Sequence, residues 1–199
     1  MEFGRLITVM VTPFNDDLSV NYSEAKRLAR HLVSTGSDSI LLGATGGESA
    51  TLKDAERVEL LKAVRDELGP GIPIIVGTGG NDTESSVKLT QLIGDAGADA
   101  VFAVVPYYNK PPQEGLFRHF EAIASSTKLP VFLYNVPGRT GVNLIPATVE
   151  RLAAIPNIVA MKETAGNLDQ ITELLRCVPS HFHVYTGDDN LAIPALSVG

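Results

Sequence analysis

The residues Val131-Phe132-Leu133-Tyr134-Asn135, followed further along by Ile158-Val159-Ala160-Met161-Lys162, decide the fold class of this chain. Each run is a short apolar segment of the kind that forms a buried strand. Between them, Pro146–Ala154 has the spacing of an amphipathic helix, and a proline suits the first helical turn. This part of the chain therefore predicts a strand, a helix and a second strand, which is one βαβ unit.

The same alternation of apolar runs and helical patterns recurs along the whole chain. The predicted strands lie roughly 25 to 35 residues apart, which is the length of one βα unit. They are Leu6–Val11, Ser39–Leu42, Ile74–Gly77, Ala100–Val105, Val131–Asn135, Ile158–Lys162 and His183–Thr186. The predicted helices are Tyr22–Ser34, Lys53–Leu68, Thr83–Ala96, Gln113–Ser125, Pro146–Ala154 and Leu168–Cys177. Alternating units of this kind imply a parallel sheet.

Two architectures use such units: an open doubly wound sheet and a closed (β/α)₈ barrel. The nucleotide-binding open sheet has G-x-G-x-x-G after its first strand, where this chain has Thr12-Pro13-Phe14. Distinctive polar residues instead follow many strands, which is typical of a barrel. They are Thr45, Tyr107, Tyr108, Tyr134, Lys162 and Gly187-Asp188-Asp189.

We therefore predict an α/β chain with the TIM (β/α)₈ barrel architecture, forming a single domain over residues 1–199. Seven βα units are predicted, and the chain stops where an eighth strand is due, at Ser197-Val198-Gly199. The eighth unit and a C-terminal helical region are thus missing. Because such barrels typically need about 250 residues, we expect this chain to be a portion of a longer polypeptide.

Composition narrows the function classes. The net charge of −7, with no basic run, argues against a nucleic-acid or anionic-membrane partner. The start of the chain lacks the pattern of a signal peptide, and its one cysteine fits a reducing cytoplasm, so a cytoplasmic location is predicted. His181 and His183 are two residues apart, as strand alternation also explains, and no metal site is predicted.

Lys162 is the candidate nucleophile. It ends an apolar run, where a charged ammonium is costly, and a lysine in such a place can lose its proton. The neutral amine is the form that makes a Schiff base with a carbonyl substrate. A surface lysine just past a strand is the alternative.

Three further groups are predicted near the same end of the strands. Tyr134 ends the preceding strand, and a phenol there can transfer protons. Arg139 can hold a carboxylate through a forked pair of hydrogen bonds. The glycine-rich turn 43–49 presents backbone N–H groups suited to an anion. Each also has an ordinary structural interpretation: a core aromatic, a surface ion-pair partner and a plain strand-to-helix turn.

Eight short motifs in register over the whole chain resemble the dihydrodipicolinate synthase and N-acetylneuraminate lyase family of class I aldolases. They are Val11-Thr12-Pro13-Phe14, Gly46-Gly47-Glu48-Ser49-Ala50-Thr51-Leu52, Gly77-Thr78-Gly79, Pro106-Tyr107-Tyr108-Asn109-Lys110-Pro111, Gln113-Glu114-Gly115-Leu116, Tyr134-Asn135-Val136-Pro137-Gly138-Arg139-Thr140-Gly141, Lys162-Glu163 and Gly187-Asp188-Asp189.

The resemblance implies that Lys162 forms a Schiff base with pyruvate and that no separate cofactor is needed. It implies Tyr134 as the general acid and base, linked by Thr45 to Tyr108 of a neighbouring subunit, with a homodimer or homotetramer as the assembly. Arg139 would bind the carboxylate of L-aspartate 4-semialdehyde. The implied reaction is the entry step of diaminopimelate and lysine biosynthesis.

One departure concerns the glycine-rich turn. The family usually has two successive threonines, whereas this chain has Thr45-Gly46. The Gly46 N–H can still meet the pyruvate carboxylate, but one hydroxyl contact is lost, which is worth about 1.5–3 kcal/mol. Two alternatives stay open: a sister aldolase acting on 2-keto-3-deoxy sugar acids or N-acetylneuraminate, and a non-catalytic truncated relative. Arg139 favours the semialdehyde enzyme over the sugar-acid aldolases.

Overall fold

The computed structural model describes residues 2–199, which divide into two compact units. The first unit comprises the residues up to Thr78 together with Leu89–Phe102, and the second comprises Gly79–Lys88 and Ala103–Gly199. Helix α3 (Thr83–Asp95) and strand β4 (Ala100–Val104) each run from one unit into the other.

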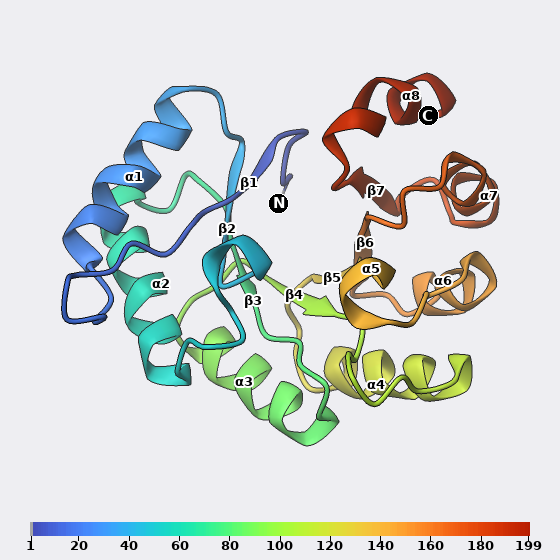
Figure 1. Ribbon diagram of the computed structural model, residues 1–199, viewed down its shortest axis with the longest axis horizontal. Coiled ribbons are helices and arrows are strands. Elements are labelled where there is room, and N and C mark those ends of the chain that lie inside the picture. Colours follow the sequence, from blue (N-terminus) through green and yellow to red (C-terminus); the bar gives the residue numbers. More distant parts are fainter. Residues whose placement is uncertain (1) are drawn as a thin grey trace. The chain divides into compact units, whose positions relative to one another are not determined.

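The first unit is a parallel sheet with helices, labelled in Figure 1. Its elements are β1 (Ile7–Val9), α1 (Tyr22–Ser34), β2 (Ser39–Leu42), the 3₁₀ turn η1 (Thr45–Gly47), α2 (Asp54–Leu68) and β3 (Ile74–Gly77). Strands pair in chain order from β1 to β4, all parallel. Strands β2 and β3 are buried along their whole length, as expected for strands covered on both faces.

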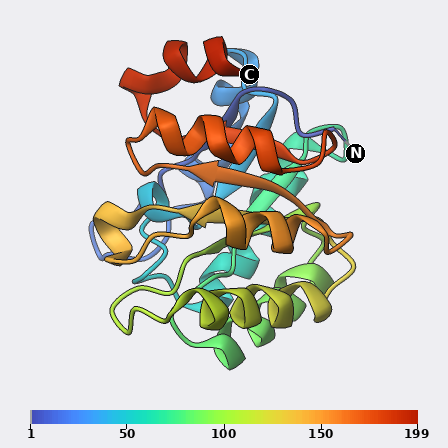
Figure 2. The ribbon, with the colours of Figure 1, turned by 90° about the vertical axis from the view of Figure 1, so that its right-hand side faces the viewer.

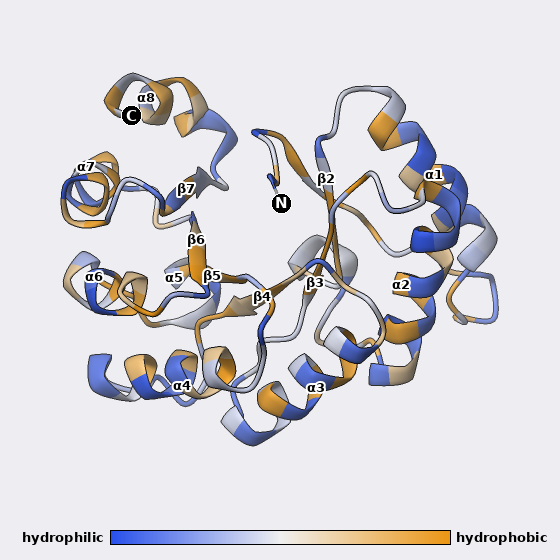
Figure 3. Ribbon diagram, turned by 180° about the vertical axis from the view of Figure 1, so that it is seen from behind, coloured by the Kyte–Doolittle hydropathy of each residue, from blue (hydrophilic) through white to orange (hydrophobic). Residues whose placement is uncertain are grey.

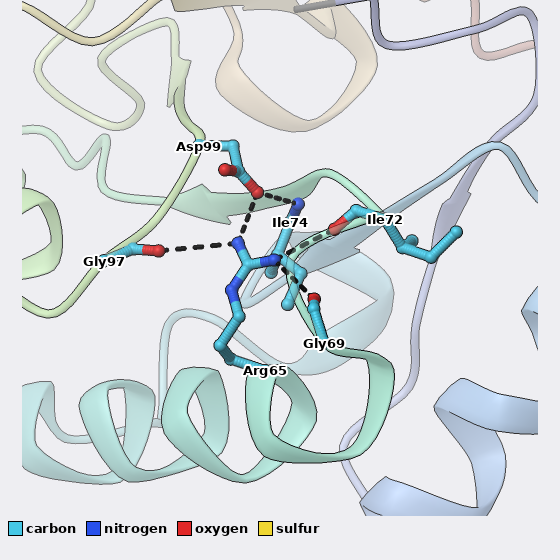
Figure 4. A network of polar contacts seen from close by, with 6 residues as sticks. All are labelled: Arg65, Gly69, Ile72, Ile74, Gly97 and Asp99. Carbon is cyan, nitrogen blue, oxygen red and sulfur yellow. Dashed lines mark hydrogen bonds and ion pairs between the residues drawn. The ribbon is translucent and has the colours of Figure 1, made fainter.

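Arg65 fastens the end of α2 to the strands that follow (Figure 4). Its guanidinium donates to the carboxylate of Asp99, whose same oxygen accepts the Ile74 N–H at 2.7 Å. Further bonds go to three backbone carbonyls, those of Gly69, Ile72 and Gly97. One arginine thus satisfies carbonyls at the end of α2 and at the entries to β3 and β4, groups that would otherwise lack partners.

The second unit repeats the pattern. Its elements are α4 (Gln113–Ser125), β5 (Val131–Asn135), α5 (Pro137–Thr140), α6 (Pro146–Ala153), β6 (Ile158–Glu163), α7 (Leu168–Cys177), β7 (His183–Thr186), the 3₁₀ turn η2 (Asp189–Leu191) and α8 (Ala192–Val198). Strand β6 pairs in parallel with β5 and with β7. Directly after β4, the Val105 N–H donates to the Tyr134 carbonyl of β5 at 2.9 Å.

Helices α4, α6 and α7 lie side by side in this unit (Figure 2). Helix α7 buries Ile171 and Leu174, whereas Glu173 and Arg176 form an exposed ion pair on its outer side. Strand β6 is coloured as hydrophobic in Figure 3, while the helices carry both hydrophobic and hydrophilic residues. This division matches the periodicities that predicted the elements.

The pairing of β5 with β6 contains an irregularity. Val131 pairs with Ile158, but the next residue, Phe132, pairs with Ala160, so β6 has one extra residue at Val159. Such a bulge re-aims the side chains that follow it.

Two differences from the predicted elements stand out. Strand β1 is shorter than the predicted Leu6–Val11, and both of these terminal residues are more than half exposed, at 53% and 55%. The residues where an eighth strand was due instead complete α8, because the chain after β7 turns into helix at Asp189. The remaining predicted strands and helices are confirmed to within one residue at each end.

Candidate active site

Lys162 and Tyr134 meet on neighbouring strands of the second unit. They are paired in the register of β5 and β6, and the Lys162 Nζ lies 4.9 Å from the centroid of the Tyr134 ring. Tyr134 is buried, and Lys162 is half-buried. A phenol beside an amine supplies a proton donor and acceptor next to a nucleophile, the arrangement that imine formation requires.

The surroundings of Lys162 favour its neutral form. Burial lowers the pKa of the Lys162 ammonium, while the charges of Asp188 and Asp189 act in the opposite direction. Desolvation is the larger effect, because a charged group loses its hydration when it is buried. The side chain is therefore a better nucleophile than an exposed lysine at the same pH.

Gly187, directly after β7, leaves room for the lysine. A Cβ at this position would collide with the Lys162 Cε and the Thr164 Oγ1 and lie 3.3 Å from the Lys162 Nζ. Among the described residues, the buried Thr164 hydroxyl has no hydrogen-bond partner. From the sequence, Gly187 and Asp188 were noted as residues that follow a strand and as part of a family motif, and neither was connected to the lysine. Only the fold brings β6 and β7 together at this level.

Arg139 lies on the short helix α5, which follows β5 directly. Pro137 begins this helix and Gly141 ends it with a φ of 73°, in the left-handed region that glycine tolerates. The guanidinium is exposed, and no hydrogen bond or ion pair with residues 2–199 holds it. It is therefore available to bind an anion.

Tyr108 lies on the loop after β4 and is 89% exposed, with a φ of 73°. Its relay role stays a prediction. Thr45 and Gly46 belong to the first unit, where they begin the turn η1 and are exposed. That turn is held by the Thr12 hydroxyl, which donates to the Gly47 carbonyl at 2.7 Å.

Gly46 stands where the family usually has its second threonine, and the structure shows what a side chain there would contact. A Cβ there would lie 3.3 Å from the Val9 Cγ1, closer than most such contacts. A threonine would therefore require Val9 to shift, whereas glycine fits without adjustment.

Glu163 is a buried group that the sequence analysis did not single out. It is 1% exposed and lies next to Lys162 in β6. Burial raises the pKa of the Glu163 carboxyl, and hydrogen bonds from Asn135 and Gln170 act in the opposite direction. Its partner Asn135 in β5 is 28 residues away and Gln170 in α7 is seven residues away, so neither follows from the pattern of β6 itself.

The described residues also bear on metal binding and on membrane insertion. Between residues 2 and 199, no group of three or more His, Cys, Asp or Glu residues is placed to hold a metal ion. No helix of this part of the chain has both the length and the apolar character needed to cross a membrane.

The sequence matches the Dihydrodipicolinate synthetase family over residues 2–199, and the chain belongs to this family. The 4-hydroxy-tetrahydrodipicolinate synthase of Desulforamulus reducens is 54% identical over 200 residues, covering 100% of this chain and 68% of the relative. That of Heliobacterium modesticaldum is 55% identical over 199 residues, covering 100% and 66%. The chain thus spans about two thirds of the length of these relatives.

Solved structures agree with the sequence relatives. The dihydrodipicolinate synthase DapA-2 of Bacillus anthracis has a TM-score of 0.98 at 45% identity, covering 100% of this chain and 68% of that one. The Acinetobacter baumannii enzyme, crystallised with pyruvate, has a TM-score of 0.96 at 40% identity, covering 100% and 68%. These comparisons confirm the predicted family, the TIM-barrel fold class and the function as a lyase of the 4-hydroxy-tetrahydrodipicolinate synthase type.

Proposed function

We propose that this chain carries the Schiff-base machinery that condenses pyruvate with L-aspartate 4-semialdehyde. The observation that supports this most directly is the pairing of Lys162 with Tyr134 on adjacent strands. The Lys162 Nζ lies 4.9 Å from the centroid of the Tyr134 ring. The pyruvate in the Acinetobacter baumannii structure supports the choice of the first substrate.

In the proposed reaction, the Lys162 amine attacks the pyruvate carbonyl to form a carbinolamine. Tyr134 transfers the protons needed to release water and leave an iminium. Loss of a methyl proton then gives an enamine, whose carbon attacks the semialdehyde aldehyde. Finally, the amine of the semialdehyde displaces Lys162, which returns the enzyme to its free state as the ring closes.

The remaining groups bind the two substrates or relay protons. We propose that Thr45 and the Gly46 N–H contact the pyruvate carboxylate and that Arg139 binds the semialdehyde carboxylate. Tyr108, linked through Thr45, would complete the relay from the second protomer of a homodimer or homotetramer. The exposure of Tyr108, at 89%, is compatible with a role at a neighbouring copy. We further propose that the reaction needs no cofactor beyond the Schiff base, that residues 1–199 belong to one barrel domain, and that the protein is cytoplasmic, as fits lysine biosynthesis.

The test is trapping by pyruvate and borohydride, followed by peptide mass spectrometry. Reduction of the imine fixes the pyruvate carbons on the reacting lysine, and we expect the adduct on Lys162 alone. Lys162→Arg should abolish the adduct because arginine does not deprotonate in a protein. Lys128→Arg is the control, since Lys128 is an exposed lysine in the loop before β5. An adduct that persists in Lys162→Arg contradicts the proposal.

A further inference from the structure

The carboxylate of Glu163 is buried, and within residues 2–199 it has no cationic partner. Both of its oxygens accept from the Asn135 Nδ2 at 3.1 Å. One oxygen also accepts the Ala165 N–H at 2.7 Å, and the other accepts from the Gln170 Nε2 at 3.0 Å. Every one of these partners is a hydrogen-bond donor, which is the set that fits an ionised carboxylate rather than a protonated acid.

The side-chain amides around Glu163 cannot flip, exchanging their oxygen and nitrogen, without losing hydrogen bonds. The Asn135 Oδ1 accepts the Leu144 N–H at 3.0 Å, so the Asn135 Nδ2 must face Glu163 and the Asn143 Oδ1, which lies 2.7 Å away. Asn143 and Gln170 exchange two bonds, of 2.8 and 3.1 Å. The orientation of each amide therefore follows from the charge at Glu163 and from one backbone N–H.

This network lies next to the catalytic pair. Asn135 and Glu163 are paired in the register immediately after Tyr134 and Lys162. Successive side chains of a strand point to opposite faces, so the bond from Asn135 to Glu163 ties β5 to β6 on the face away from the lysine. It is thus a side-chain link across these strands, one residue beyond the reacting groups.

The hydrogen bonds around Glu163 also reach the segment of the chain that follows Arg139. Asn143 and Leu144 lie just beyond α5, the helix that carries this arginine. The Asn143 carbonyl in turn accepts from the Gln113 Nε2 of α4 at 2.7 Å. One buried carboxylate is therefore bonded, directly or through one amide, to β5, α7 and the segment after α5.

We propose that Glu163 is a positioning residue: through Asn135 and Gln170 it holds the Lys162 amine opposite the Tyr134 phenol and anchors the segment that follows Arg139. The inference rests on the proposed Schiff-base function. Replacing the carboxylate by an amide places N–H groups against N–H groups, and the bonds between β5, β6 and α7 loosen. A displacement of the reacting groups by about 1 Å can lower a rate up to about a hundredfold.

The experiment compares Glu163→Gln with Glu163→Asp and with Glu173→Gln, a matched control on the exposed side of α7. For each variant, circular dichroism checks folding, and the rate of borohydride trapping at Lys162 is measured at saturating pyruvate and across pH. We expect folded Glu163→Gln to be trapped at least about tenfold more slowly, with kcat reduced more than the KM for pyruvate. Glu163→Asp, which keeps the charge, should recover part of the rate, and Glu173→Gln should match the unaltered chain.

A folded Glu163→Gln with an unchanged trapping rate and pH profile overturns the inference. If Glu163→Gln does not fold, Gln170→Ala decides, because it removes one donor from the carboxylate while leaving both strands unaltered. We expect its trapping rate to fall several-fold, and an unchanged rate overturns the inference. Failure to trap the unaltered chain at Lys162 would instead contradict the proposed function itself, so the two outcomes are distinguishable.

Discussion

Lys162 and Tyr134 occupy opposed positions on two adjacent parallel strands, with the amine nitrogen 4.9 Å from the centre of the phenol ring. Because both groups are on strands rather than loops, their separation is set by backbone pairing and by the packing of β5 against β6. A site supported in this way keeps its geometry without help from a ligand.

The pH dependence of trapping should reveal the lowered pKa of Lys162. Only the neutral amine attacks a carbonyl, so a lowered pKa moves half-maximal trapping to a pH below about 10.4, the ordinary lysine value. The trapping rate measured from pH 6 to 10 (roughly the range in which such lysines titrate) should therefore rise at lower pH than for a free lysine side-chain analogue.

Asp188→Asn should shift this profile further. Asp188 raises the pKa of Lys162, so removing its charge should move half-maximal trapping to still lower pH. The asparagine oxygen can still accept the Gly166 N–H, now bonded at 3.1 Å, so the loop should keep its shape. A profile that moves to higher pH, or does not move, would show that Asp188 does not act on the lysine.

Arg139→Ala should separate the two substrates. The guanidinium is exposed and unpaired within residues 2–199, so its removal should leave the fold and the pyruvate adduct unchanged. Loss of a charged hydrogen bond worth about 1.5–3 kcal/mol should raise the KM for the semialdehyde by about tenfold or more. Arg27→Ala, at an exposed position on α1, is the control. Equal losses with both substrates would indicate a structural role for Arg139.

Gly187→Ala should impair Lys162 directly. The added methyl would collide with the Lys162 Cε and the Thr164 hydroxyl, so the lysine must move away from its position opposite Tyr134. We expect trapping to slow by about tenfold and the free energy of unfolding to fall by about 1–3 kcal/mol, as for overpacking elsewhere. Gly71→Ala, where a Cβ meets nothing within 4 Å, should change neither quantity.

His119 should make the protein sensitive to acid. Burial lowers its pKa from 6.5 to about 4, and its Nδ1 lies 2.8 Å from the Thr83 hydroxyl. The unfolded chain therefore binds a proton that the folded chain excludes between these pH values, so stability falls as pH decreases through this window. Below about pH 4, the free energy of unfolding should be lower by the full amount, about 3 kcal/mol.

Urea unfolding between pH 4 and 6.5 measures this effect (these limits being the two pKa values of His119). The stability of His119→Gln should depend less on pH over this interval than that of the unaltered chain. His31→Gln, at an exposed position on α1, should retain the original dependence. Identical slopes for His119→Gln and the unaltered chain would show that this histidine is not the acid-sensitive group.

The elements of the fold could be predicted because each carries its own period. Strand β5 and helix α7 have the predicted ends, since apolar runs and helical spacing are local properties. The helix α5 was not predicted, because four residues are too few to show a helical period. The final helix α8 was missed for a different reason: its seven residues are almost all apolar and include Pro194, so no alternation of polar and apolar residues marks a helix.

For the site, the lysine and the tyrosine could be predicted, but the groups that hold them could not. Lys162 is anomalous within an apolar run, which is visible in the sequence alone. Glu163 has no such signal, because its donors at Asn135 and Gln170 become neighbours only when β5, β6 and α7 are assembled. Matching amides to a buried carboxylate is a tertiary relationship, and single-sequence patterns carry no information about it.

The extra residue in β6 has a consequence for how this chain can be altered. Continuing the pairing of Val131 with Ile158 without interruption would place Met161 opposite Tyr134, and the bulge at Val159 places Lys162 there instead. A slip of one residue reverses the face on which every later side chain emerges. The chemistry therefore depends on the number of residues in β6 before Lys162. A graft of this strand into another barrel must keep the bulge, or it will place the thioether of Met161 opposite the tyrosine in place of the Lys162 amine.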